Sequence, residues 1–316
     1  MRKLFDAHRQ IRRYGLEGAR HRAKTKLERN CIDAAQLVSQ SDINHDDVGY
    51  ATLAAMCLPH KSLDKSACPD RWSRAVDNFS VVLESGVDDE GVPVGIPYGS
   101  KARLILLYLT TQSIQARQPS VDWASSMYAW LQAMRHPPGG GMTNKLFMRQ
   151  AWRISSLIMH WRIDDGEYAI RLSGRGINEV EQSADSGSGI GLPFSRYQAE
   201  GRFPEKIGFD PGFWQLAKKQ YCPIRLTALG KIANNSAAID LYIWLAHRLP
   251  ELKASTVWTW KEVVAQFGPH YRNSRQMISN FIDVLSLVLA VYPEAHIRIS
   301  ATGLMLSPSA GPVADG

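Results

Sequence analysis

One pattern occurs twice in this sequence, and it constrains the fold more than any other feature. In each copy, a short turn is followed by a helical segment rich in arginine and amide side chains, and then by a β-hairpin. The first helical segment is 143–153, with its hairpin at 163–168, and the second is 271–278, with its hairpin at 297–303. The two copies share little residue identity. The pattern therefore predicts two domains of similar design in one chain.

The segments that flank these helices complete the same order of elements in both halves. In the second half, Thr259 and Glu262 form a capping box that starts one helix, and a longer helix is predicted over 273–290. In the first half, the glycine- and proline-rich segment 137–141 ends a helix whose apolar stripe has 4-3-4 spacing: Trp123, Met127, Trp130 and Met134. Helix, turn, longer helix and hairpin is the order of a winged-helix domain.

We therefore predict an α+β fold that is mainly α, with two tandem winged-helix domains whose wings are β-hairpins. The serine- and glycine-rich stretch 183–189 is the best candidate for the linker. The predicted organisation is a basic N-terminal arm over 1–30, a helical N-terminal extension over 31–75, a first winged-helix domain over 76–190 and a second over 191–316.

Length and composition restrict the broad class of protein. A chain of 316 residues is long enough for two domains with their own cores. No uninterrupted apolar run approaches the ~18 residues of a membrane span, so no membrane partner is expected. The cysteines form no C-x-x-C pair and are expected to be reduced thiols of a cytoplasmic protein: Cys31, Cys57, Cys68 and Cys222.

The net charge of +7 is concentrated at one end of the chain. Residues 1–30 contain ten Lys and Arg residues against three acidic residues, an excess of seven, so the remainder of the chain is balanced. One interpretation of the basic run is a solvated or disordered arm, and another is an arm that lies along phosphates. Both hold if the arm becomes ordered on binding.

The first arginine-rich helix is predicted to carry its cations on one face. At roughly 100° per residue, Lys145, Arg149 and Arg153 lie within about 80° of one another. No acidic residue occurs from Trp123 to Ile163, whereas a solvated helix face usually mixes signs. We therefore predict that this helix contacts double-stranded DNA, with a merely solvated surface as the alternative. The candidate residues are Asn144, Lys145, Arg149, Gln150 and Arg153.

The second helix has the residue types that recognise bases. Arginine can bind guanine O6 and N7 in a fork, and asparagine or glutamine can bind adenine N6 and N7. The first turn of a recognition helix is where bases are reached in helix-turn-helix docking. The candidates here are Arg272, Asn273, Arg275, Gln276 and Ser279. Arg162 and Arg298, in the two predicted wings, are expected to contact the DNA backbone.

Catalytic motifs are weak in this sequence. The segment 138–143 lacks the lysine of a phosphate-binding P-loop and follows a helix rather than a strand. The histidines include no His-x-His pair and no H-E-x-x-H motif, so a metal-dependent nickase is unsupported. We therefore expect a protein that is not an enzyme, with no catalytic residues, no metal and no cofactor.

Several ordered blocks resemble a known family. They are Gly95-Ile96-Pro97-Tyr98-Gly99-Ser100-Lys101-Ala102-Arg103, which continues to Leu109, then 235–246, Gln266-Phe267-Gly268 and Val291-Tyr292-Pro293-Glu294-Ala295. Over about residues 50–310 the chain is similar to the plasmid-encoded RepA replication initiators. That resemblance implies two winged helices, binding to direct repeats (iterons) at a plasmid origin, melting of adjacent DNA and recruitment of the host initiator and replicative helicase.

The resemblance also implies a homodimer that represses its own gene, and a bacterial, plasmid-associated location. Met142 departs from the family pattern, in which a basic residue often precedes the threonine, and a phosphate contact is therefore in doubt at this position. The alternative function from another class is a winged-helix transcriptional repressor without a replication role. Sequence chemistry alone does not separate the two, because both proteins bind duplex DNA.

Overall fold

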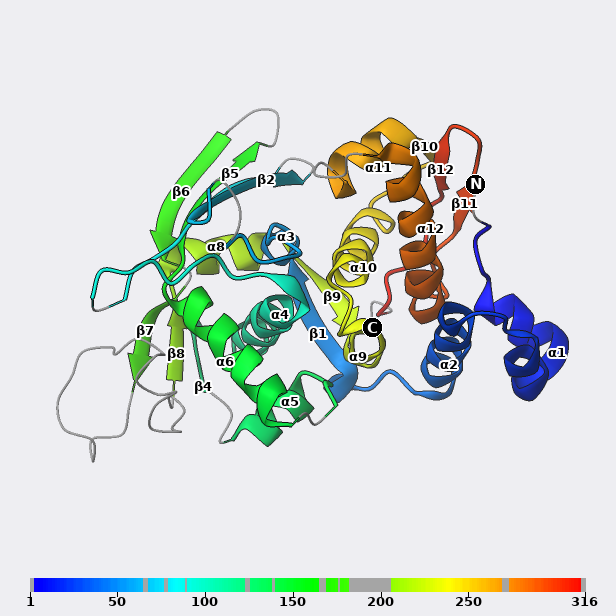
Figure 1. Ribbon diagram of the computed structural model, residues 1–316, viewed down its shortest axis with the longest axis horizontal. Coiled ribbons are helices and arrows are strands. Elements are labelled where there is room, and N and C mark those ends of the chain that lie inside the picture. The colour runs from blue at the N-terminus through cyan, green and yellow to red at the C-terminus, as the bar shows by residue number, and fades with distance from the viewer. Residues whose placement is uncertain are drawn as a thin grey trace. The chain divides into compact units, whose positions relative to one another are not determined.

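The computed structural model describes residues 3–64, 68–76, 79–88, 90–122, 126–137, 140–164, 169–175, 177–181, 206–268 and 273–313. The chain forms two compact units. Unit 1 comprises Met1–Gly49 together with Cys222–Gly316, and unit 2 comprises Tyr50–Tyr221. The chain passes from unit 1 to unit 2 within strand β1 (Val48–Thr52) and returns within β9 (Tyr221–Arg225) (Figure 1). The observed division differs from the predicted boundaries because both ends of the chain contribute to unit 1.

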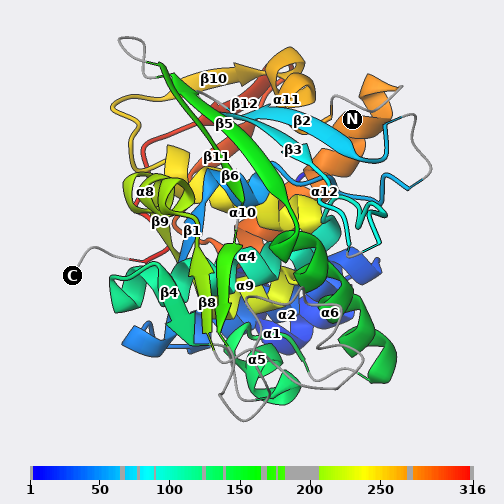
Figure 2. The same ribbon diagram turned by 90° about the vertical axis from the view of Figure 1, so that its left-hand side faces the viewer.

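Unit 2 contains two antiparallel sheets. Figure 2 shows the larger one as a twisted layer, made in spatial order of β2 (Arg71–Val76), β3 (Phe79–Glu84), β5 (Ile158–Asp164) and β6 (Ala169–Arg175). Burial alternates along β3, so that Phe79, Val81 and Leu83 face the core. The smaller sheet consists, in spatial order, of β4 (Ser120–Asp122), β8 (Lys206–Phe209) and β7 (Ile177–Glu181).

The helices of unit 2 pack around a central apolar helix. They are α3 (Leu53–Met56), α4 (Gly99–Ala116), α5 (Met127–Ala133), α6 (Gly141–Ser155) and α8 (Pro211–Lys219). Helix α4 is buried from Ala102 to Thr111, which explains its nearly uniform apolar sequence. Arg103, in that stretch, is fully buried and donates hydrogen bonds to the carbonyls of Leu58, Pro59 and Gly99.

Unit 1 is mainly helical, with one small sheet. Its helices are α1 (Ala7–Arg22), α2 (Lys26–Gln40), the short 3-10 helix η1 (His45–Asp47), α9 (Leu226–Ile232), α10 (Ser236–Arg248), α11 (Trp260–Phe267) and α12 (Ser274–Val291). Its sheet consists, in spatial order, of β10 (Thr256–Thr259), β12 (Gly303–Leu306) and β11 (Ile297–Ile299), all antiparallel. The core lies where α12 packs against α2 and α10 (Figure 1). Trp244 of α10 stacks on Trp258 of β10, with ring centroids 4.2 Å apart.

The basic N-terminal segment belongs to the folded body of unit 1. Within residues 3–30 the chain forms α1 and the start of α2, and Thr25 starts α2 with a capping box. The Phe5 N–H donates to Ser286 Oγ (3.0 Å), and His8 Nε2 lies 3.0 Å from the Ala290 carbonyl oxygen of α12. The expected separate arm is therefore a helical hairpin docked on the last helix of the chain.

A buried ion pair ties the end of α2 to the start of α9. Arg225 Nε donates to Asp47 Oδ2 (2.9 Å), and both side chains are almost fully buried. Arg225 also donates to the carbonyls of Val38 and Ser41, while Asp47 Oδ1 accepts from the Thr227 N–H (2.6 Å). Because both charges are paired and hydrogen-bonded, the pair holds these segments in one arrangement without an uncompensated buried charge.

Several local predictions are confirmed. The strand β8 spans Lys206–Phe209, and Asp210 caps α8 by accepting from the Gly212 N–H at 2.8 Å. Thr259 and Glu262 form the predicted capping box of α11. The four cysteines are free thiols, and burial raises the pKa of Cys31 and Cys222 to about 12. The predicted linker 183–189, the hairpin turn at Asp165-Gly166 and the residue Trp123 of the apolar stripe lie outside the described residues.

In the described part of the chain, α12 alone has the length and mean hydropathy of a membrane-spanning helix. Half of that segment is buried inside the structure. Its buried face includes Phe281, Leu285 and Val288, which belong to the core of unit 1. The core helix of a folded domain passes the same test, so the apolar sequence is accounted for by packing.

Candidate nucleic-acid interface

The start of α12 presents polar side chains above a buried apolar face. Asn273, Ser274, Arg275 and Gln276 are all exposed. Met277, one residue further along, is buried, and the burial continues at Phe281 and Leu285 on the same side. This helix can therefore offer its first turn to a partner while its other face stays packed in unit 1.

Arg275 is the strongest candidate for contact with a base. Its side chain is exposed, and the structure gives it no carboxylate partner within the part of the chain described. An unpaired guanidinium keeps its full set of donors, which form the fork that matches guanine O6 and N7. Arg272, which was predicted to act beside it, lies outside the described residues.

The two amide residues of this turn are partly committed to the helix itself. Asn273 is the N-cap, and its Oδ1 accepts from the Gln276 N–H at 3.1 Å. Gln276 Nε2 donates to Asn280 Oδ1 at 2.8 Å. A fork to adenine needs both the oxygen and the nitrogen of one amide, so Asn273 would have to give up its cap, at a cost of about 1 kcal/mol. Asn280 joins the candidate face through this hydrogen bond, and both Asn280 and Ser279 are half-buried.

The sequence interpretation missed Asn280, although the i,i+4 spacing from Gln276 signalled it. Neighbours one turn apart on a helix face can hydrogen-bond through their amides. The pair Gln276–Asn280 is therefore a preformed patch of donors and acceptors beside Arg275.

The sheet after α12 provides a second exposed cation. Arg298 of β11 is exposed, and its cross-strand neighbour Met305 of β12 is also exposed. The turn between these strands is closed by the Ser300 N–H, which donates to the Gly303 carbonyl at 2.8 Å. Gly303 is required there, because a Cβ at this position would lie 2.0 Å from the Trp258 carbonyl oxygen of β10. Arg298 is thus held on a well-defined strand, β11.

The corresponding helix of unit 2, α6, has a different environment. Lys145, Arg149 and Arg153 follow one another at four-residue intervals, and burial increases along the row. Lys145 is exposed, the Arg149 side chain is 55% exposed and the Arg153 side chain is 2% exposed. The row of cations therefore starts at the surface of unit 2 and ends in its interior.

Two of the predicted contact residues of α6 support the fold instead. Arg153 Nη1 donates to the Ile96 carbonyl at 3.1 Å, and its guanidinium lies over the Tyr98 ring at 5.1 Å. Gln150 is buried, and its Oε1 accepts from the Tyr98 N–H at 2.8 Å. The prediction that Gln150 and Arg153 face DNA is wrong, because the segment from Gly95 to Tyr98 covers this end of α6.

Gly95 allows this close packing. Its φ is 91°, which side-chain-bearing residues rarely adopt. A Cβ there would also come within 3.1 Å of Arg153 Nη2. The block Gly95-Ile96-Pro97-Tyr98 is therefore a structural element that receives the end of α6.

Asp64 is a partner that the sequence did not reveal. It lies 3.2 Å from Arg153 Nη2 and 3.9 Å from Arg149 Nη2. A hydrogen bond with Ser62, with a further contribution from the positive charge of Arg153, lowers the pKa of the Asp64 carboxyl. The sequence shows no acidic residue between Trp123 and Ile163, but this describes only the neighbours of α6 along the chain. Asp64, which pairs with α6 in the folded structure, comes from a segment about 85 residues earlier.

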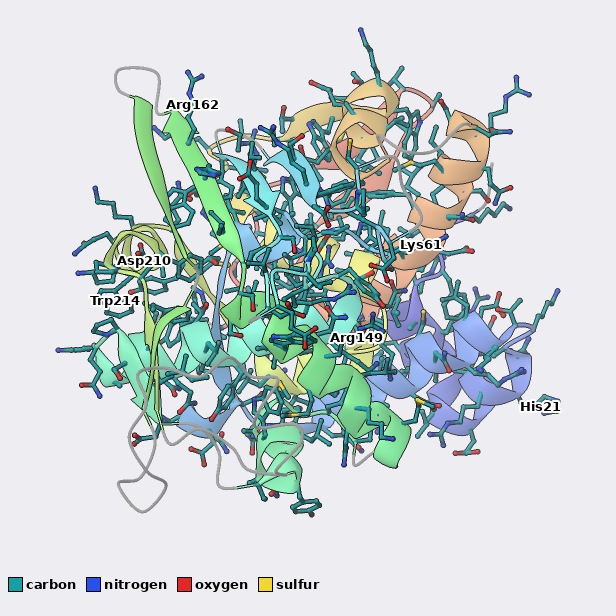
Figure 3. The ribbon with its side chains drawn as sticks, turned by 60° about the vertical axis from the view of Figure 1, so that its left-hand side comes forward. His21, Lys61, Arg149, Arg162, Asp210 and Trp214 are labelled. Carbon is teal, nitrogen blue, oxygen red and sulfur yellow. The ribbon has the colours of Figure 1, made fainter. Side chains whose placement is uncertain are left out.

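The remaining candidates of unit 2 are more accessible. Lys145 is exposed, and Asn144 is half-buried. Arg162 of β5 is exposed and points away from the sheet (Figure 3). Its cross-strand register partners are Ser80 of β3 and Arg171 of β6. Unit 2 therefore retains Lys145, Arg149 and Arg162 as exposed candidates.

A fold of mixed helices and strands, with a cationic helix start beside a small sheet, defines a candidate nucleic-acid-binding protein. The sequence matches the family model "Plasmid encoded RepA protein" over residues 96–262, which is more than half of the chain. The chain belongs to the family of plasmid-encoded RepA proteins, which are plasmid replication initiators. The family resemblance found in the sequence is thus confirmed.

Two solved structures are similar to this chain. One is the crystal structure of selenomethionine derivatives of domain 2 and domain 3 of RctB, with a TM-score of 0.48, 11% sequence identity, and coverage of 81% of this chain and 96% of that chain. The other is a crystal structure of RctB domains 2–3, with a TM-score of 0.45, 12% identity, and coverage of 81% and 97%. No curated protein matches the sequence.

Proposed function

We propose that this protein initiates plasmid replication by binding iterons in duplex DNA at the origin, then promotes melting of the adjacent DNA and recruits the host initiator and replicative helicase. It acts by binding rather than by catalysis, and homodimerisation belongs to the same proposal. The observation that carries the proposal is the exposed Arg275 at the first turn of α12, which has no carboxylate partner among the described residues and lies beside the Gln276–Asn280 amide pair.

The order of elements in unit 1 supports a winged-helix domain. Helix α11 is followed along the chain by the longer α12 and then by the β11–β12 hairpin, with β10 paired to β12. In unit 2, α5, α6 and the β5–β6 hairpin follow one another in the same order. We propose that the two sets are tandem winged helices, with the start of α12 as the main recognition element.

In this arrangement, the two kinds of contact have separate roles. Arg275 and the amide patch discriminate between base pairs, and each good paired contact contributes about 1–3 kcal/mol of discrimination. Arg298 contacts the phosphate backbone and helps to fix the register of the protein on the duplex. The exposed cations of unit 2 have the same role if α6 and the β5–β6 hairpin also lie on DNA. If about 6–10 phosphates are neutralised, affinity falls about 10³–10⁵-fold between 50 and 200 mM salt.

The proposal is tested by comparing binding to origin DNA and to a scrambled duplex of equal length. For Arg275→Ala we expect a loss of about 1–3 kcal/mol on the origin repeat and relaxed specificity at one base pair. The matched control is Arg298→Ala, which removes an exposed arginine of the proposed wing. This variant should weaken binding to both duplexes equally. If Arg275→Ala weakens binding to both duplexes equally, Arg275 contacts a phosphate instead of a base. If wild-type protein does not prefer the origin, the proposal fails.

A second assay separates an initiator from a transcriptional repressor with the same DNA-binding surface. A plasmid that carries only the origin and this gene should be maintained in a host, and the Arg275→Ala variant should lower its copy number. Specific binding without maintenance would favour the repressor. Metal-dependent cleavage or primer synthesis by the purified protein would contradict a purely binding role.

A further inference from the structure

The α1–α2 hairpin of unit 1 carries a cationic surface that the proposed recognition helix does not use. At roughly 100° per residue, Arg9, Arg12 and Arg13 lie within about 100° of one another on α1. The opposite side of that turn holds the buried Ala7 and the half-buried Ile11. Figure 3 shows His21, near the end of the same helix, pointing outward.

The carboxylates of this region are engaged within the hairpin. Asp6 caps α1 by accepting from the Arg9 N–H, and Glu28 accepts from the N–H groups of Lys24 and Thr25. Glu17 and Asp33 both pair with Arg20. In the part of the chain that is described, seven other exposed basic residues of the hairpin have no carboxylate partner: Arg9, Arg12, Arg13, Arg22, Lys24, Lys26 and Arg29.

A kink in α1 brings two of these arginines to one aromatic ring. Gly15 has φ 67° and ψ 174°, which interrupts the helix. The Arg13 guanidinium lies 5.2 Å and the Arg22 guanidinium 4.2 Å from the centre of the Tyr14 ring. A Cβ at Gly15 would have nothing within 4 Å, so glycine is needed for its backbone conformation rather than for space. Two like charges held at one ring repel each other, and a bound anion relieves that repulsion.

We propose that the α1–α2 hairpin is a second DNA-contact surface, which binds backbone phosphates without sequence preference. This inference rests on the proposed function, because origin DNA supplies the phosphates. The guanidiniums of Arg13 and Arg22 form its centre, and Arg12 and Lys26 extend it. Multidentate donors such as guanidinium match phosphate oxygens.

The position of the hairpin on α12 separates it from base recognition. Its contacts Ser286 and Ala290 lie ten and fourteen residues after Gln276, which is about 15–21 Å along the helix axis. The hairpin therefore does not occupy the place of the base-reading turn. Its contribution should add to the affinity for any duplex and leave the discrimination by Arg275 unchanged.

The surface fits a nucleic acid better than an anionic membrane. A helix that binds a membrane interface needs large apolar side chains to insert between the lipids. Within the α1–α2 hairpin, all of which is described, Leu37 of α2 is the one large apolar side chain that is exposed, and a single leucine does not form an apolar face. Leu4, Phe5, Ile11 and Leu16 are all half-buried.

The test measures the salt dependence of binding to origin DNA and to a scrambled duplex. The variant Arg12→Gln/Arg13→Gln/Lys26→Gln should reduce the slope of log affinity against log salt by about 2.7 on both duplexes, if each cation neutralises one phosphate. The ratio of the two affinities should stay at the wild-type value. The charge-matched control is Lys218→Gln/Lys219→Gln/Lys231→Gln, which removes three exposed lysines of α8 and α9.

The outcomes distinguish the two proposals. If the hairpin variant has the same slope as the control, the hairpin surface is overturned while origin specificity stands. If the wild-type protein shows no origin preference, the proposed function fails instead. If the hairpin variant loses binding to phosphatidylserine vesicles while its DNA slope is unchanged, the surface belongs to a membrane and the inference is also overturned.

Gly15→Ala tests the geometry without changing any charge. Alanine disfavours the left-handed conformation, so the kink should straighten and separate Arg13 from Arg22. We expect the salt slope to fall by about 1, as for the loss of one phosphate contact. Gly91→Ala is the matched control, since Gly91 also has a positive φ and open space around it but lies in unit 2. Equal slopes for both variants would show that the kink has no role in binding.

Discussion

Helices α6 and α12 have similar sequences of cations and amides, but the structure uses them differently. In α12 the cation Arg275 and the amides Asn273 and Gln276 lie at the helix start and are exposed. In α6 they extend along three turns, from the exposed Lys145 to the buried Arg153. The start of α12 remains a candidate for base contact, whereas the end of α6 is part of the core of unit 2.

The difference between α6 and α12 shows that a helical sequence pattern does not reveal which of its residues are exposed. Spacing of four residues places side chains in one stripe, but it does not say whether the whole stripe lies at the surface. In unit 2, the segment 95–98 and Asp64 cover the end of the stripe and provide partners for Arg153. Arg153 is buried with both terminal nitrogens hydrogen-bonded, although its Nε has no partner in the described chain, so the charge of an arginine alone does not predict exposure.

The largest expected difference is between the buried Arg153 and the half-exposed Arg149 of α6, and it concerns the stability of the protein. Arg153→Ala removes the donor to the Ile96 carbonyl and leaves a cavity, so we expect the free energy of unfolding to fall by about 2–4 kcal/mol. Arg149→Ala, one turn earlier on the same helix, should change it by less than about 1 kcal/mol because that ion pair is half-exposed. Urea unfolding of the two variants measures the difference. A stable Arg153→Ala protein with weakened DNA binding would restore Arg153 as a contact residue.

A similar contrast is expected for the two glutamines. Gln150→Ala leaves the Tyr98 N–H without its acceptor at the start of α4, which should cost about 1–3 kcal/mol. Gln276→Ala removes an exposed side chain, so it should change stability by about 0.5 kcal/mol or less and act instead on DNA binding. Thermal unfolding and binding to the origin repeat, measured on both variants, check this pair. Equal stability losses would contradict the assignment of Gln150 to the fold.

Local signals in the sequence predicted the elements of unit 1 well. The cap at Thr259 and the apolar period of α12 are decided by neighbouring residues, so their positions could be read directly. The domain division could not be read in this way. Phe5 contacts Ser286, about 280 residues later, and no local pattern encodes a contact of that range. The basic segment 1–30 was therefore expected as an arm, although it packs on the last helix.

The candidate site was predicted in part for the same reason. The exposure of Arg275 follows from its place before the buried Met277, which the amphipathic period of α12 indicates. The burial of Arg153 depends on Asp64 and Ile96, which lie far away in the sequence. Residues whose partners are local were placed correctly, and residues whose partners are distant were not.

A smaller effect, which depends on pH, is expected for the contribution of the Asp64 carboxyl to stability. Hydrogen bonding with Ser62 and the charge of Arg153 lower its pKa below the ordinary value of 3.8. A carboxyl whose folded pKa is depressed stabilises the protein above its unfolded pKa, and this stabilisation is lost as the pH falls through the folded pKa. The stability difference between wild type and Asp64→Asn should therefore be present at pH 6 and shrink below about pH 4. Urea midpoints across this range measure it, and a constant difference would show that the charge of Asp64 does not stabilise unit 2.

The smallest expected effect concerns Lys145, the exposed cation at the start of α6 that remains a candidate for DNA contact. If Lys145 contacts one phosphate, Lys145→Gln should reduce the salt slope of origin binding by about 0.9, and Arg298→Gln should do the same in unit 1. Equal reductions would mean that both units lie on DNA, as two tandem recognition domains require. A reduction with Arg298→Gln alone would restrict DNA contact to unit 1. The exposed start of α6 would then be available for another partner, because it also carries the exposed apolar residues Met142 and Leu146.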